Sequence, residues 1–297
     1  MWRRPGMSGS FAIVLAYASS RLTDDLRQPT LRDPPEGSKA PDSGWLTLFD
    51  LVAARALDLS LTESAPLTPS PSLTRAVFAR MMELRVIRAA GEAKSDEVLG
   101  RSIYERAVWS SDGDFPTGHD LATALRRHAF GSARGESVQL EQAEIWLRLA
   151  VSELEGYARH LLRGTPATEL ALAHFVRLLP NLLRTASVAA VRRALWLHLR
   201  GPQVAAMPTP QEDAPNAFAE QMVARVFATA RRMEGRDDNL QFTPVDGAPV
   251  PLMRRVFLTE ACAIGLRYWT RPPTLSVLNQ EASAHGYHRR FQPSPRG

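Results

Sequence analysis

Apolar residues recur at steps of three and four along much of this 297-residue chain, and that spacing places them on one face of a helix. The clearest case lies within residues 138–201. Its first half carries one continuous apolar stripe, made of Leu140, Ala143, Leu147, Ala150, Leu154, Tyr157 and Leu161. Gly164 is expected to end this helix and Thr165-Pro166 to begin a second one, which Pro180 interrupts.

The same periodicity predicts further helices on both sides of this pair. They are expected over residues 45–61, 73–91, 95–109, 119–130, 217–233, 252–269 and 274–284. Proline-rich segments without periodicity separate several of them, because proline removes a backbone donor and disfavours helix in the residue before it. The predicted fold is therefore mainly α, an irregular multi-helix array or bundle with proline-rich connecting loops.

The hydrophobic content of 44% is enough for a sizeable core in one domain or in two lobes. The positions of the linkers divide the chain into five parts. These are an N-terminal segment and linker (1–44), a helical core (45–201), a linker (202–216), a C-terminal helical lobe packed on the core (217–273), and a short helix with a basic tail (274–297).

The net charge of +5 comes almost entirely from arginine, because Lys39 and Lys94 are the only lysines. A GC-rich coding sequence would give the same bias, but arginine also forms forked contacts with phosphates and carboxylates. Residues 170–207 contain no acidic residue, and aromatic residues alternate with basic ones in the C-terminal tail. The predicted partner or phosphate surface consists of Arg177, Arg184, Arg192, Arg193, Arg200, Arg289 and Arg290.

The alternative for these arginines is a solvated helix face, in which they pair partly with carboxylates of the preceding helix. Those carboxylates are Glu141, Glu144, Glu153 and Glu155. Exposed ion pairs of this kind contribute little to stability. The sequence leaves both interpretations open.

Signatures of common enzymes are missing. The chain has no Gly-x-x-x-x-Gly-Lys-Ser/Thr, no Gly-x-Gly-x-x-Gly between a strand and a helix, and no Gly-x-Ser-x-Gly. Glu281, His285 and His288 have the spacing of metal ligands on one helical face, but Gly286 interrupts that helix and no fourth ligand is identifiable. We therefore assign no catalytic residue, no metal and no cofactor.

The N-terminus has the outline of a secretory signal, since Arg3 and Arg4 precede an apolar run that ends in Ala-x-Ala at residues 16–18. The run is short and is separated from the arginines by Gly6 and three small residues, which favours a buried N-terminal element. No apolar run approaches the ~20 residues of a membrane helix. We expect a cytoplasmic protein without a membrane span, with a signal peptide at 1–18 as the alternative.

These observations predict a non-catalytic α-helical interaction protein, a subunit or adaptor of a larger bacterial assembly that binds one or more protein partners. Two alternatives remain open. The first is a nucleic-acid-binding protein that uses the Arg177–Arg200 surface, because positive side chains attract phosphates. The second is a helical enzyme with a metal or small-molecule site.

Overall fold

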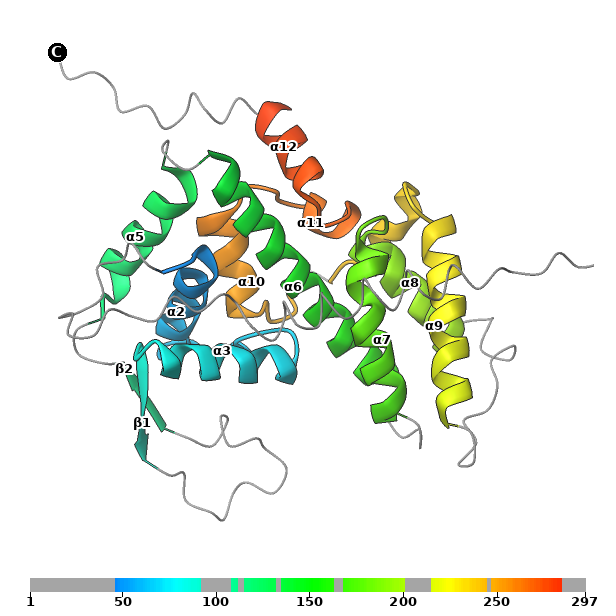
Figure 1. Ribbon diagram of the computed structural model, residues 1–297, viewed down its shortest axis with the longest axis horizontal. Coiled ribbons are helices and arrows are strands. Elements are labelled where there is room, and N and C mark those ends of the chain that lie inside the picture. The colour runs from blue at the N-terminus through cyan, green and yellow to red at the C-terminus, as the bar shows by residue number, and fades with distance from the viewer. Residues whose placement is uncertain are drawn as a thin grey trace, which may run out of the picture.

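The computed structural model describes residues 46–91, 108–111, 115–131, 135–162, 168–200, 215–244 and 247–284. The prediction of a mainly α multi-helix array is confirmed (Figure 1). The α-helices are α2 (Leu48–Ser60), α3 (Pro71–Glu83), α5 (Gly118–Phe130), α6 (Gly135–Leu161), α7 (Thr168–Leu183), α8 (Val188–Leu199), α9 (Pro215–Arg232), α10 (Leu252–Val256), α11 (Arg267–Thr270) and α12 (Leu275–Ala284). The 3₁₀ helix η4 (Asp237–Phe242) and the π-helical turn η5 (Phe257–Ala261) follow α9 and α10.

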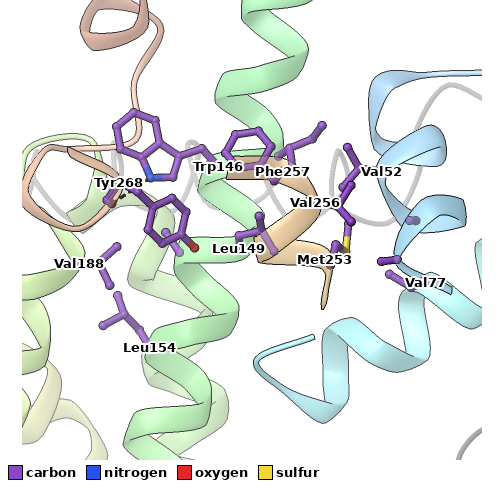
Figure 2. Packing of buried hydrophobic residues seen from close by; sticks show 14 of the residues in the cluster. Val52, Val77, Trp146, Leu149, Leu154, Val188, Met253, Val256, Phe257 and Tyr268 are labelled. Atoms are coloured by element: carbon purple, nitrogen blue, oxygen red, sulfur yellow. Dashed lines mark hydrogen bonds between the residues drawn. The ribbon is translucent and has the colours of Figure 1, made fainter. Parts of the chain in front are cut away.

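Helix α6 is central and contacts α2, α3, α7, α8 and α12. Its fully buried Trp146 donates its indole N–H to the carbonyl of Tyr268 at 3.1 Å, and the two rings stack with centroids 6.2 Å apart. Figure 2 shows these two residues facing each other beside Leu149 of α6. The indole N–H is therefore satisfied while the ring is removed from water.

The buried surface of α6 is wider than the predicted stripe. Leu140, which the stripe includes, is 50% exposed, whereas Gln142, Ile145 and Trp146 are buried. The physical reason is that α6 has neighbours on several sides, so that one amphipathic face does not describe its surroundings. Gln142 donates to the carbonyl of Ala261 at 2.7 Å, which satisfies a polar group inside the core.

The helix predicted over residues 73–91 is too long. Helix α3 ends at Glu83, and Arg85 then takes a φ of 56°, in the left-handed region that terminates helices. The chain continues as strand β1 (Ile87–Gly91), which pairs antiparallel with β2 (Val108–Ser111). The end of the helix predicted over 95–109 is therefore strand, and residues 92–107 lie outside the described residues.

One predicted interruption lies at a different position, and one helix predicted as continuous is interrupted. Pro180 lies inside α7, which runs on to Leu183, and the break follows at residues 184–187, where the Ser187 hydroxyl accepts from the Ala190 N–H at 3.2 Å and caps α8. The helix predicted over 252–269 is divided into α10, η5 and α11. Residues 262–266, including Gly265 with a φ of 57°, separate the last two.

Helices on both sides of residues 202–216 contribute to one hydrophobic cluster. Helix α9 packs on α7 and α8, while α10 packs on α2. The backbone N–H groups of Leu252 and Met253 donate to the carbonyls of Pro66 and Leu67 at 2.8 and 2.9 Å. The domain boundaries themselves stay a prediction. Among the described residues, no helix combines the length and hydropathy needed to cross a membrane.

An ion pair is buried where α6, α8, α10 and α11 approach one another. Arg254 of α10 donates to Glu153 of α6 at 2.6 Å, and these residues are only 5% and 8% exposed. Burial raises the pKa of Glu153 above its ordinary value, and Arg254 opposes that rise. The guanidinium of Arg254 also lies 5.0 Å from the ring centre of Trp269.

Glu153→Gln should lower the free energy of unfolding by about 3–5 kcal/mol, because it leaves the Arg254 guanidinium buried without a counter-charge. The exposed Glu144 in the same helix is the matched control, and Glu144→Gln should change it by no more than about 0.5 kcal/mol. Denaturant titrations measure both values. Equal effects of the two variants would show that the buried pair has no special role.

Gly156→Ala should also destabilise the fold, although alanine is favoured in helices by about 1 kcal/mol. A Cβ at Gly156 would lie 2.6 Å from the carbonyl oxygen of Pro69, which is backbone and cannot rotate away. We expect a loss of about 1–3 kcal/mol. Gly135→Ala, where the Cβ meets nothing within 4 Å, should be neutral or stabilising in the same titration. A more stable Gly156→Ala variant would contradict this packing.

Candidate functional site: the arginine-rich surface of α7, α8 and α9

Arginines outnumber carboxylates in the part of the chain that forms α7, α8 and α9. Residues 168–236 contain nine arginines and five carboxylates, a net charge of +4. Helices α7, α8 and α9 group together at one end of the molecule (Figure 1). A local surplus of positive charge attracts acidic partners.

Arg192 is not a free surface group. Its guanidinium lies 4.3 Å from the ring centre of Tyr157 and 5.8 Å from that of Trp269, so it packs between α6 and α11. Burial lowers the pKa of Arg192, while Glu153 and Tyr157 oppose that change. This arginine is therefore half-buried against two rings, and it is the one residue of the predicted set that we place near Glu153.

Arg193 is half-buried and contacts the segment after α9. It forms an ion pair with Asp238, and its guanidinium lies 5.7 Å from the ring centre of Phe242. These contacts join α8 to η4. Part of its charge is therefore neutralised within the fold.

Arg177, Arg184 and Arg200 are exposed. Arg177 is hydrogen-bonded to the Nδ1 atom of His174 at 3.1 Å. Arg184 and Arg200 have no carboxylate partner among the described residues. These three positions carry charge that is available to a partner.

Three of the four carboxylates of α6 named in that alternative have other partners. Glu153 binds Arg254, and Glu155 lies 3.6 Å from Arg159 and accepts from the Ser72 hydroxyl. Glu141 accepts from the Leu48 N–H at 2.6 Å. The alternative in which these groups pair with the exposed arginines is therefore not supported for Arg184 and Arg200.

Trp196 lies on the same face of α8 as Arg193 and Arg200, at steps of three and four. It remains 38% exposed and meets Phe242 of η4 with ring centroids 6.0 Å apart. Leu240 of η4 is 52% exposed. We call these five residues, Arg193, Trp196, Arg200, Leu240 and Phe242, the α8 outer surface.

The predicted site did not include Trp196. The spacing of Arg193, Trp196 and Arg200 was visible in the sequence and could have indicated it. Leu240 and Phe242 had no such signal, because η4 reaches α8 only through the tertiary fold.

His198 is buried between α8 and α9, and its Nε2 atom lies 2.9 Å from the Thr229 hydroxyl. Burial lowers the pKa of His198, and the positive charges of Arg225 and Arg232 act in the same direction. The imidazole is therefore held neutral and structural rather than presented to a substrate.

The remaining predicted residues cannot be placed. Arg289, Arg290, His285 and His288 lie outside the described residues, and so does the side chain of Glu281. Over the described ranges, no group of three His, Cys, Asp or Glu side chains could hold a metal ion. The candidate metal ligands, to which no metal was assigned, and the basic tail stay predictions.

Cys262 is not an activated nucleophile. Its thiol is buried, and burial raises its pKa to about 12. A cysteine nucleophile requires the thiolate, which this environment disfavours.

No known protein family matches the chain, and neither the curated proteins nor the solved structures contain a significant match.

Lowering the pH should destabilise the contact between α8 and α9. Because the folded chain lowers the pKa of His198, the unfolded chain binds more protons below the ordinary value of 6.5. The free energy of unfolding therefore decreases as the pH falls from 6.5 toward the pKa of His198 in the folded chain. For one proton this decrease is at most about 1.4 kcal/mol per pH unit. Denaturant titrations between pH 8 and pH 5 measure this slope.

His198→Gln should reduce this slope. The comparison variant is His174→Gln, since burial and Arg177 lower the pKa of His174 in the same direction. The double variant His198→Gln, His174→Gln should show the smallest change of unfolding free energy with pH. If the slope were unchanged in all three variants, these histidines would not be the source of the pH dependence.

Proposed function

We propose that this chain is a non-catalytic interaction protein that binds an acidic protein partner through the α8 outer surface, as a subunit or adaptor of a larger assembly. The observation that carries the proposal is Trp196, which stays partly exposed between two arginines. Fully burying this side chain in a partner would remove more apolar area from water.

The composition of the surface suits a protein interface. Tryptophan and arginine are the residues most enriched at positions that dominate binding energy, and lysine is depleted in interface cores. Arg193 already contacts Asp238 and Phe242, which restrains its side chain before binding. A restrained side chain loses less conformational entropy when a partner docks.

A protein partner fits this surface better than nucleic acid does. A groove that follows a phosphate backbone is expected to be positive throughout, but here the exposed Asp238 lies against Arg193 and the exposed Leu240 adds apolar area. Arg192, one of the predicted phosphate ligands, is occupied inside the fold. A partner that combines carboxylates with an apolar groove would match this mixture.

The test is affinity isolation of the tagged chain at native expression level, with and without nuclease. We expect a protein partner that survives nuclease treatment. The double variant Trp196→Ala with Arg200→Glu should bind this partner at least tenfold more weakly, because it removes the apolar anchor and reverses a charge that has no carboxylate partner in the described part of the chain.

Arg126→Glu on α5 is the matched control, since Arg126 is exposed but lies outside the α8 outer surface, and it should bind like the natural chain. Circular dichroism establishes that each variant is folded. Unchanged partner binding by the double variant, or complete loss of all partners on nuclease treatment, would overturn the proposal.

A further inference from the structure

A cavity of about 220 Å³ lies among α2, α3 and α5, near the start of β1. Its walls are mainly apolar and include Leu57, Phe78, Ile87, Phe115 and Leu121. The helices that line it lie at the end of the molecule opposite α8 and α9 (Figure 1). An engineered apolar cavity of about 150 Å³ is known to bind benzene, so this one is large enough for an aromatic ring with a short substituent.

One charged side chain, Asp58 of α2, is part of the cavity wall. Its Oδ2 atom accepts from Arg55 at 2.5 Å and from the Gly118 N–H at 3.1 Å. Both bonds go to the same oxygen, so within the described part of the chain Oδ1 has no hydrogen-bond partner. The carboxylate is thereby held in place with one acceptor left for a ligand.

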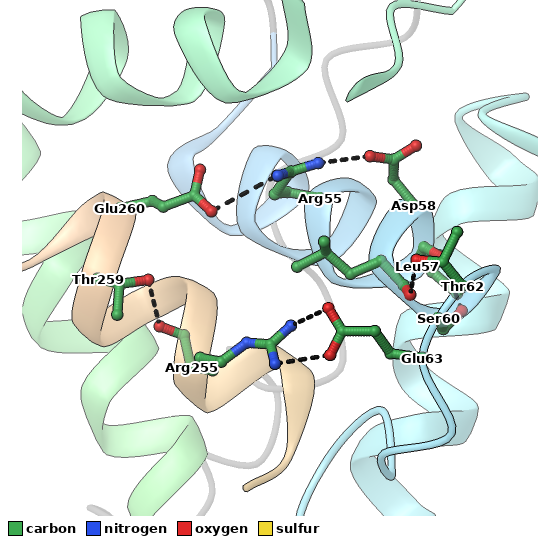
Figure 3. A network of polar contacts seen from close by, with 10 residues as sticks. Arg55, Leu57, Asp58, Ser60, Thr62, Glu63, Arg255, Thr259 and Glu260 are labelled. Atoms are coloured by element: carbon green, nitrogen blue, oxygen red, sulfur yellow. Dashed lines mark hydrogen bonds and ion pairs between the residues drawn. The ribbon is translucent and has the colours of Figure 1, made fainter. Parts of the chain in front are cut away.

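The charge around Asp58 is not balanced. Arg55 lies between Asp58 and Glu260 of η5, at 2.5 and 3.5 Å, so one guanidinium serves two carboxylates (Figure 3). The neighbouring Arg255 and Glu63 neutralise each other through two hydrogen bonds of 2.7 and 2.6 Å. The network of five groups therefore carries a net charge of −1.

We propose that this cavity binds a small aromatic amine, with the ring among the apolar walls and the ammonium group on Oδ1 of Asp58. The volume and the apolar lining suit the ring. The free carboxylate oxygen and the missing positive charge suit an ammonium group, because charge-assisted hydrogen bonds are about twice as strong as neutral ones. An aromatic carboxylate would instead be repelled.

Three probes that share a phenyl ring and a short tail test this selectivity in the full chain. They are 2-phenylethylamine, 2-phenylethanol and phenylacetate. Isothermal titration and thermal denaturation should both show the order amine, then alcohol, then carboxylate. Equal affinity for amine and carboxylate, or no binding of the amine at millimolar concentration, would overturn the proposal.

Two variants connect this binding to the cavity. Asp58→Asn keeps the size of the side chain and an acceptor for the Gly118 N–H but removes the charge, so it should weaken amine binding about tenfold or more and leave the alcohol unchanged. Ala54→Leu, at a buried wall position, should fill the cavity and abolish binding of both. Unaltered amine binding in either folded variant would place the amine elsewhere.

Arg126→Glu again serves as the control and should bind all three probes like the natural chain. The proposal does not depend on the α8 outer surface. The Trp196→Ala, Arg200→Glu double variant should bind the amine normally, so that failure of one proposal is distinguishable from failure of the other.

Discussion

The ion pair between Glu153 and Arg254 is the constraint on which the arrangement of the helices depends. Removing two charged groups from water costs several kcal/mol per ion, and the cost is recovered only when partners and good geometry are present. Here α6 supplies the carboxylate, α10 supplies one guanidinium, and Arg192 of α8 adds a second positive charge nearby. The aromatic rings of Tyr157 and Trp269 cover the guanidinium groups. The pair therefore joins α10 to α6, and the charge of Arg192 brings α8 to the same carboxylate.

The orientation of α8 connects this buried cluster to the proposed interface. Arg192 and Trp196 are one helical turn apart and lie on the same side of α8. Arg192 packs against the rings of Tyr157 in α6 and Trp269 in α11. The ring of Trp196 packs against Phe242 of η4. Arg192 therefore marks where this side of α8 is covered by α6 and α11, and Trp196 lies one turn further along the same side, where it remains 38% exposed beside Phe242.

Much of the fold was predictable because its signals are local. The helical spacing of apolar residues in α6 and α9, and the proline content of the linkers, can be read from residues that are close together in the sequence. The interruptions are not visible in local patterns. Helix α7 continues through Pro180 to Leu183, with Phe175, Leu179 and Leu182 buried, and α3 ends just before Arg85 takes a positive φ. The same limit applies to the site. The predicted list treated Arg192 and Arg200 alike, since no local pattern distinguishes a guanidinium above Tyr157 from one in water.

The segment formed by α10 and η5 makes ion pairs with residues of two different helices and of the segment after α2. Arg254 points to Glu153 in α6, Arg255 to Glu63 after α2, and Glu260 to Arg55 in α2. A regular α-helix repeats every 3.6 residues, and the π-helical turn at η5 changes that repeat between Arg255 and Cys262. The wider turn ends with the Cys262 N–H bonded to the Phe257 carbonyl at 2.8 Å. One short segment therefore contacts both Glu153 beside α8 and the five-group network beside the Asp58 cavity.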